Sequence, residues 1–137
     1  MDDLDRDILD ILRRDARLPF TEIADRVETS EGTVRNRVDR MIEENVIERF
    51  TVAAQTGHVR AMITVVVDVD VDTNAVAQEM ATWEAVEFVW QVSGEEDLIM
   101  IVDAVDTGRV NELITQAREM EEVVRTKTRL ILDEQLG

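Results

Sequence analysis

The chain has 137 residues, of which 45% are hydrophobic, and a formal net charge of −16. It contains no cysteine and a single histidine, which excludes disulfides and thiolate metal sites and leaves zinc with too few ligands. No apolar run approaches the roughly 18 residues of a membrane span, and the acidic start MDDLDRDILD lacks the positive charge of a secretion signal. We therefore expect a cytoplasmic protein with no membrane partner.

The acidity argues against DNA as a partner in ordinary buffer, because affinity for phosphates normally comes from Lys and Arg that displace condensed counterions. The acidic residues are, however, spread over the whole chain, and of the 15 basic residues only Lys127 is a lysine. This pattern is typical of a protein adapted to molar salt, where the Debye length falls to about 3 Å and long-range repulsion largely disappears. An acidic protein that does not bind nucleic acid is the alternative interpretation of the charge alone.

Two short helices are predicted before residue 28. The first runs to about Arg14, because apolar residues recur at the spacing of one helical face: Leu4, Ile8, Ile11 and Leu12. The break Leu18-Pro19-Phe20 follows, and Thr21 is expected to cap the second helix. The inward residues of that helix are expected to be Ile23, Ala24 and Val27.

A third helix is predicted after the turn at Glu28-Thr29, with Ser30 or Thr29 as N-cap. Asn45 is expected at its C′ position, since Asn tolerates the left-handed conformation. The inward face of this helix is predicted to be Val34, Val38, Met41 and Ile42. Three short helices joined by tight turns are what a helix-turn-helix requires.

The outward face of the third helix is rich in Arg and Asn, whose side chains read guanine and adenine edges or grip phosphates. Residues 32–41 hold three arginines and one acid, although acids outnumber bases twofold in the chain. The outward and flanking residues are Thr33, Asn36 and Arg40, with Arg35 and Arg37 at the sides. A solvated arginine-rich face is the alternative for an isolated helix, but the two preceding helices and the hairpin expected after it favour DNA recognition.

The stretch Val46–Ala53 is β-prone and is expected to form a wing. Arg49 there could reach a phosphate, or it could pair with Glu48 or Glu44. Gln55-Thr56-Gly57-His58 is typical of a turn, which predicts a DNA-binding domain at 1–54, a linker at 55–60 and a second domain at 61–137. His58 is interpreted as a solvated linker residue without a role.

The second domain is predicted to have the element order βαββαβ. Arg60–Asp72 alternates in polarity at the period of a strand. The later elements are a helix at Thr73–Thr82, strands at Val86–Val92 and Leu98–Val105, a helix from Thr107 to about Met120 and a strand at Val123–Leu132. This is the ferredoxin-like order, in which the first and third strands, here the most apolar, lie at the centre of an antiparallel sheet. The fold class is thus α+β: a winged helix-turn-helix followed by a ferredoxin-like, RAM/ACT-like domain.

Two helices can cover only one face of a four-stranded sheet. The other face also carries apolar side chains such as Met62 and Val66, so we expect another copy of the chain to bury it. A dimer also suits DNA with paired half-sites. Trp83, Phe88 and Trp90 are interpreted as core or interface residues and not as a ligand cage.

The run Asp68-Val-Asp70-Val-Asp72 is interpreted as an acidic strand end that discourages aggregation. A calcium loop needs glycine at its sixth position and glutamate at its twelfth, where this chain has Thr73 and Glu79. No metal, catalytic or cofactor site is assigned to the chain.

Three segments, DRDILDILRRDAR, FTEIADRVETSEGTVRNRVDRMIEENVIERF and QVSGEEDLIMIVDA, resemble in that order the Lrp/AsnC family, the feast/famine regulators of bacteria and archaea. The resemblance spans nearly the whole chain and implies a transcriptional regulator that binds double-stranded DNA and assembles as dimers, often as tetramers or octamers. It places Ser30 on the recognition helix together with Thr33, Arg35, Asn36, Arg37 and Arg40. With the dispersed acidity, it implies a halophilic archaeon as the source.

The resemblance also implies an amino-acid effector bound at the loop between the second and third strands, where Gly94 and Asp97 match a Gly-x-x-Asp pattern. A carboxylate such as Glu95 suits an α-amino group, and a glycine turn exposes backbone N–H groups to an α-carboxylate. Thr126 and Thr128 on the last strand are expected to add polar contacts. A hairpin turn with a capping aspartate is the alternative for Gly94 and Asp97.

Two other functions compete with this interpretation. The architecture also resembles siroheme decarboxylases, but a domain with one lysine, four arginines and no histidine suits an anionic tetrapyrrole poorly, so we expect no enzyme. A ligand sensor or scaffold that has lost DNA binding is the other alternative.

Overall fold

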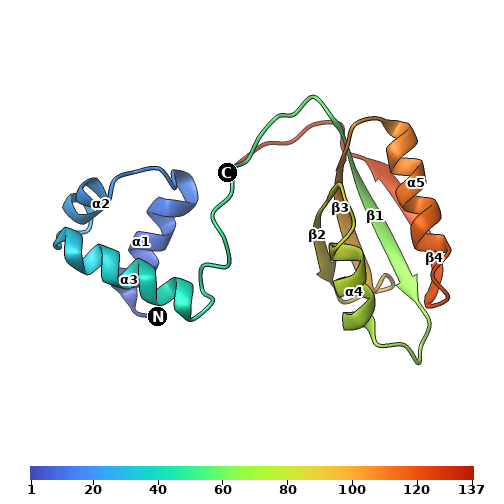
Figure 1. Ribbon diagram of the computed structural model, residues 1–137, viewed down its shortest axis with the longest axis horizontal. Coiled ribbons are helices and arrows are strands. Elements are labelled where there is room, and N and C mark those ends of the chain that lie inside the picture. The colour runs from blue at the N-terminus through green and yellow to red at the C-terminus, as the bar shows by residue number, and fades with distance from the viewer. The chain divides into compact units, whose positions relative to one another are not determined.

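The computed structural model describes all 137 residues, which form five helices and one four-stranded sheet (Figure 1). Contacts within the chain divide it into two compact units, Met1–Ala54 and Gln55–Gly137. None of the five helices has the length and apolar character that crossing a membrane requires.

The first unit contains the three predicted helices, α1 (Asp3–Arg14), α2 (Phe20–Arg26) and α3 (Glu31–Glu43). Asp2 caps α1 in a capping box with Asp5, and Ser30 caps α3 by accepting a hydrogen bond from the Thr33 backbone N–H. The three helices enclose one apolar core, whose buried residues are Ile8, Leu12, Ile23, Ala24, Val34, Val38, Met41 and Ile47.

Two details of these helices differ from the predictions. The second helix begins at Phe20 with Pro19, not Thr21, at its N-cap, because the proline ring already holds φ at −61°. Ile42 is 43% exposed and does not face the core. It lies at one edge of the buried stripe, about 80° around the helix from Val34. The opposite edge, at Arg37, is the one that contacts α1.

The predicted wing is absent. Val46–Ala53 forms neither a strand nor a hairpin, and within it only Ile47 is buried, while Val52 is 80% exposed. A hairpin needs two strands that can pair, and this segment supplies only one β-prone stretch before the chain turns at Gly57.

The second unit has the predicted order βαββαβ. Its elements are β1 (Val59–Val67), α4 (Thr73–Ala81), β2 (Val86–Gln91), β3 (Leu98–Ala104), α5 (Thr107–Arg118) and β4 (Val123–Leu130). The sheet is antiparallel with the strand order β2-β3-β1-β4, which confirms that the first and third strands are central. Helices α4 and α5 pack on one face, over a core built from alternate residues of the two central strands (Figure 1).

The acidic run does not continue β1, which ends at Val67 instead of residue 72. Asp68 donates its backbone N–H to the Glu122 carbonyl at 2.9 Å, and the chain then turns. Asp72 caps α4 by accepting from the Ala75 N–H at 3.2 Å. The alternation of polar and apolar residues therefore extends through a turn and a helix cap, which period-two patterning alone does not distinguish from a strand.

His58 is not a freely solvated residue. Its Nδ1 lies 2.7 Å from a carboxylate oxygen of Asp103, which also accepts a hydrogen bond from the Thr56 hydroxyl at 3.1 Å. Asp103 lies on β3, opposite Arg60 on β1. These bonds fasten the residues that precede β1 to the neighbouring strand.

Asn45 offers a direct test of how α3 ends, because it has the left-handed φ of +58°. A Cβ without a polar side chain is disfavoured there, so Asn45→Ala should lower the free energy of unfolding by about 1 kcal/mol. Asn45→Gly should leave it equal or slightly higher. Urea unfolding followed by helical circular dichroism measures both, with Glu44→Ala, at an ordinary φ of −86°, as the control. Equal losses in Asn45→Gly and Asn45→Ala would contradict the conformational explanation.

Candidate functional site

Helix α3 presents a polar surface because its apolar stripe is firmly buried. Val34, Val38 and Met41 are at most 2% exposed and fix the rotation of the helix. Asn36 is exposed on the opposite side, and its amide makes no hydrogen bond within the chain. At the start of the helix the hydroxyls of Ser30 and Thr33 lie 2.9 Å apart.

Arg35 also lies on the exposed side of α3. Its guanidinium pairs with Glu31, one turn earlier, at 2.5 Å and lies 5.3 Å from the centre of the Phe20 ring. Both contacts are at the surface, since the Arg35 side chain is 56% exposed. Exposed pairs of this kind contribute little free energy, so a phosphate or a base could displace Glu31.

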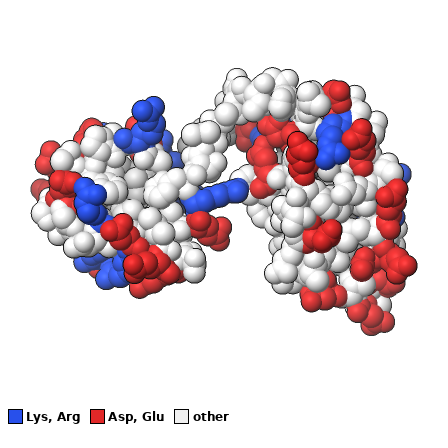
Figure 2. All heavy atoms as spheres, in the orientation of Figure 1, with Lys and Arg blue, Asp and Glu red and all other residues white.

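Arg37 and Arg40 are bound to the start of α1. The carboxylate of Asp5 is only 2% exposed and lies 3.2 Å from Arg37 Nη1 and 3.2 Å from Arg40 Nη2. Arg37 also pairs with Asp2 at 2.5 Å. We call Asp2, Asp5 and Arg37 the α1–α3 clamp. Figure 2 shows basic and acidic side chains side by side on the first unit.

The charges of the clamp shift the acid–base behaviour of its members. The hydrogen bond from Arg37, followed by that from the Asp5 backbone N–H, lowers the pKa of Asp2 to about 2. Burial alone would raise the pKa of Asp5, but bonds from the Asp2 backbone and from Arg37 outweigh it and leave that pKa below its ordinary value. The two aspartates raise the pKa of Arg37 in turn.

The loop between β2 and β3 contains the predicted effector residues. Asp97 accepts a hydrogen bond from the Val67 backbone N–H at 2.9 Å and donates its own N–H to the Val65 carbonyl at 3.0 Å. One of its carboxylate oxygens therefore anchors the loop to β1. Gly94 has φ +119°, a conformation that favours glycine, and Glu95 is exposed beside it.

Thr126 and Thr128 do not join this loop. In the β1–β4 register they lie opposite Val65 and Ile63, whose side chains are in the helix-covered core. Directly opposite residues share a face of the sheet, so the two threonines are on the helix side. The Thr126 hydroxyl accepts a hydrogen bond from Arg118 Nε at 3.2 Å, and no hydrogen bond links either threonine to Gly94 or Asp97.

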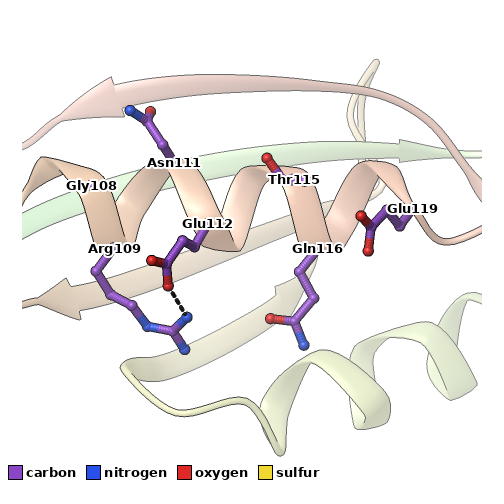
Figure 3. A pocket seen from close by; sticks show the side chains of 7 residues that line it. All are labelled: Gly108, Arg109, Asn111, Glu112, Thr115, Gln116 and Glu119. Atoms are coloured by element: carbon purple, nitrogen blue, oxygen red, sulfur yellow. Dashed lines mark hydrogen bonds and ion pairs between the residues drawn. The ribbon is translucent and has the colours of Figure 1, made fainter.

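Two hollows in the second unit contain none of the predicted effector residues. The larger, of about 500 Å³, follows the exposed side of α5, where Arg109 pairs with Glu112 at 3.0 Å and Gln116 projects on the same side (Figure 3). The smaller, of about 370 Å³, lies between α4 and β2 and is bordered by Trp90. Both are open grooves, so neither encloses a ligand in a single chain.

Comparison with known proteins decides the family. Residues 1–42 match the AsnC-type helix-turn-helix domain, and residues 60–135 match the Lrp/AsnC ligand binding domain. The chain belongs to the Lrp/AsnC family. The HTH-type transcriptional regulator LysM of Sulfurisphaera tokodaii is 31% identical to it over 133 residues, which are 96% of this chain and 95% of LysM.

Solved structures agree in fold. MtbAldR is 26% identical with a TM-score of 0.88, and the match covers 100% of this chain and 95% of that one. The Leucine response regulatory protein LrpA of Mycobacterium tuberculosis is 26% identical with a TM-score of 0.83, covering 100% and 96%. Relatives of this Lrp/AsnC chain are named as transcriptional regulators, so it is a transcriptional regulator and not an enzyme of the decarboxylase type.

The clamp of this Lrp/AsnC regulator was not predicted from its sequence. The apolar spacing that predicts the first helix assigns no role to Asp2 or Asp5. Asp2 and Asp5 are three residues apart, a spacing that permits a capping box. Arg37 and Arg40 are also three residues apart, so both pairs lie on one face of their helices. Arg37 and Asp5 are 32 residues apart in the sequence, and they meet because α1 and α3 are in contact. The local sequence pattern does not show that contact.

Acid titration should reveal the clamp. The folded pKa of Asp2, about 2, lies below the ordinary value near 3.9, so the stability it contributes is present above about pH 4 and is lost as the pH falls towards 2. In Arg37→Ala the titration midpoint of the Asp2 carboxyl carbon, followed by NMR, should rise towards the ordinary value. Arg35→Ala should leave it unchanged, because Arg35 pairs with Glu31. The same midpoint in the wild type and Arg37→Ala would show that the clamp does not form in solution.

Proposed function

We propose that this Lrp/AsnC regulator binds specific sequences of double-stranded DNA through α3, as a homodimer, and that an amino acid alters that binding. The observation that carries the proposal is the contrast across α3: a buried stripe of Val34, Val38 and Met41 on one side and an exposed, unbonded Asn36 on the other. The proposed DNA-contacting set remains Ser30, Thr33, Arg35, Asn36, Arg37, Arg40 and Arg49.

The contacts of these side chains favour different roles in DNA binding for different members of this set. Asn36 carries both a donor and an acceptor, which suits the paired edge of adenine in the major groove. Arg40 uses one nitrogen on Asp5 and is 47% exposed, so the rest of its guanidinium is available to a phosphate. Arg37 is 26% exposed and is held by two carboxylates, which favours a role in positioning the helix.

The high acidity is compatible with this function in a cell that contains molar salt. Long-range repulsion from DNA is then screened within about 3 Å, while short contacts made by α3 persist. We infer a halophilic archaeon as the source. The proposed domains of the chain are a DNA-binding domain at 1–54, a linker at 55–60 and a ligand-sensing and oligomerisation domain at 61–137.

An amino acid is the proposed effector, bound at the β2–β3 loop. Glu95 is exposed and could receive its α-amino group, while the turn at Gly94 can offer backbone N–H groups to its α-carboxylate. Asp97 would hold the loop in place, and Thr126 and Thr128 are the weakest members of the proposed set because they lie on the helix side. An amino-acid effector is supported by the name of the Mycobacterium tuberculosis relative, the Leucine response regulatory protein LrpA. A loop this open needs a second copy to enclose a ligand, which suits dimers, tetramers or octamers.

DNA binding can be tested by substitutions that spare the core. Against a DNA site selected from a random pool in molar KCl, Asn36→Ala should weaken binding by about ten- to a hundredfold and relax specificity at one base pair. Arg40→Ala should weaken binding to all sequences and lower the slope of log K against log salt by about one. Arg6→Ala, which removes a surface pair with Asp3 on α1, is the matched control. Unchanged gel shifts in Asn36→Ala and Arg40→Ala would favour a sensor that does not bind DNA.

Effector binding can be tested at the loop. Glu95→Gln removes a charge without removing a hydrogen bond of the fold, so calorimetric affinity for the amino acid that the wild type selects from a panel should fall about tenfold. Glu79→Gln, an exposed glutamate on α4, should leave the affinity unchanged. Equal affinity in the wild type and Glu95→Gln would move the effector site away from this loop, without bearing on DNA binding.

A further inference from the structure

Asp5 is the one polar residue of the chain that is buried. It lies on the core face of α1, at the helical spacing that continues to Ile8 and Leu12. An apolar side chain at this position would suit the core without removing a charge from water. A buried ion pair is often no more stabilising than apolar side chains of similar size, so stability alone does not explain a carboxylate here. The partners of Asp5 indicate what else it does.

Both oxygens of the Asp5 carboxylate accept hydrogen bonds. Oδ1 accepts from Arg37 Nη1 at 3.2 Å. Oδ2 accepts from Arg40 Nη2 at 3.2 Å and from the backbone N–H of Asp2 at 3.1 Å. Although burial raises the pKa of Asp5, its hydrogen bonds hold that pKa below the ordinary value, so the group is charged at neutral pH. One buried carboxylate therefore binds two of the three arginines of α3.

The other polar residues of α3 are not held in this way. Arg35 pairs with the exposed Glu31, and the Asn36 amide makes no hydrogen bond within the chain. Arg40 follows Asn36 by four residues, so the two side chains project from the same side of α3, one turn apart. Asp5 binds a single guanidinium nitrogen of Arg40, which fixes the direction of the remaining nitrogens relative to Asn36.

The affinity of a protein for DNA and its specificity come from different contacts. Arginines that neutralise phosphates raise the affinity for every sequence, whereas contacts with base edges distinguish one sequence from another. A phosphate that drew Arg40 away would leave the buried carboxylate of Asp5 with Arg37 as its one charged side-chain partner. The exposed pair of Arg35 and Glu31 imposes no comparable cost when it separates.

We propose that Asp5 is a positioning residue for DNA recognition, which aligns Arg40 with Asn36 and restrains Arg37. It thereby lowers the affinity for unrelated sequences more than the affinity for the specific site. The inference rests on the DNA binding by α3 proposed above, and it assigns part of the sequence specificity to a residue of α1. The negative charge of Asp5 carries the effect, because the effect passes through its ion pair with Arg40.

Asp5→Asn in the full chain tests the proposal, because the amide keeps the size and an acceptor for the Asp2 N–H but removes the charge. Binding is measured over a series of KCl concentrations, both to the DNA site selected from a random pool and to a scrambled duplex of equal length. Affinity for the scrambled duplex should rise about tenfold, and its slope of log K against log salt should steepen by about one. Affinity for the selected site should change less than about threefold.

Asp3→Asn is the matched control, because it removes the same charge from the same turn of α1. Asp3 is exposed and pairs with Arg6 at the surface, so neither the affinity for the scrambled duplex nor the salt slope should change. Asp5→Asn combined with Arg40→Ala shows whether the effect passes through Arg40. In that background, Asp5→Asn should no longer steepen the slope, whereas a purely structural effect would persist.

A second variant tests the alignment without altering the buried group. Arg40→Lys keeps the charge but lacks the planar fork that can bind Asp5 with one nitrogen and a phosphate with the others. It should leave the salt slope unchanged and lower the ratio of the affinities for the selected and scrambled duplexes about tenfold. Circular dichroism on each variant ensures that only folded protein is compared.

The possible results separate the role of Asp5 from DNA binding itself. Equal changes for the two duplexes in Asp5→Asn, in either direction, would show that Asp5 does not contribute to specificity. An equal rise in Asp3→Asn, or an unchanged affinity ratio in Arg40→Lys, would overturn the alignment and leave DNA binding by α3 intact. A wild type that binds neither duplex would refute the proposed function, and with it the inference.

Discussion

The main constraint on the second unit is that its sheet has two faces and its two helices can cover only one of them. On the helix side the central strands carry apolar residues that are wholly buried, such as Ile63, Val65 and Met100. The other side retains apolar residues at its centre but ends in aromatic rings and cations at its edges. A face of this composition is costly to leave in water, and that cost favours the homodimer proposed above.

In the first unit, the comparable constraint is the buried carboxylate of Asp5. A carboxylate that is 2% exposed must have charged or hydrogen-bonding partners, and Arg37 and Arg40 of α3 supply them. Helix α3, the proposed recognition helix, therefore cannot direct all its arginines outward. Two of them are bound to α1, and the side chains left for base recognition are nearer the start and the middle of the helix.

The sequence predicted the elements well where periodicity and local chemistry coincide. The three helices, the order βαββαβ and the central place of β1 and β3 follow from apolar spacing, and Asn45 ends α3 in the left-handed conformation expected for its C′ position. The failures have a common cause. The wing, the length of β1 and the inward direction of Ile42 were each predicted from the polarity or β-propensity of one segment, and that pattern does not show whether a second strand is available to pair, where a strand gives way to a turn, or which edge of a helix contacts its neighbour.

The same limit applies to the candidate site. Residue type correctly singled out α3 as an unusually basic helix, but it could not tell an arginine available to DNA from one held by Asp2 and Asp5. Likewise, the Gly-x-x-Asp pattern located a loop with a left-handed Gly94, yet the bond from the Val67 N–H to Asp97 shows that this aspartate is also a structural cap. Thr126 and Thr128 were placed on the correct strand, but the register turns them towards the helices.

Molar salt would act unequally on these charges. Exposed pairs, such as that of Arg35 with Glu31, are screened strongly, so their cations become available to a competing phosphate. The bonds to Asp5 are shielded from solvent and are screened much less, so Arg37 stays in place. Salt would thus weaken the repulsion between an acidic regulator and DNA and loosen the outer arginine of α3, while the contact that orients the helix remains. On this argument the acidic surface and the recognition helix are compatible only if their ion pairs differ in burial, as these do.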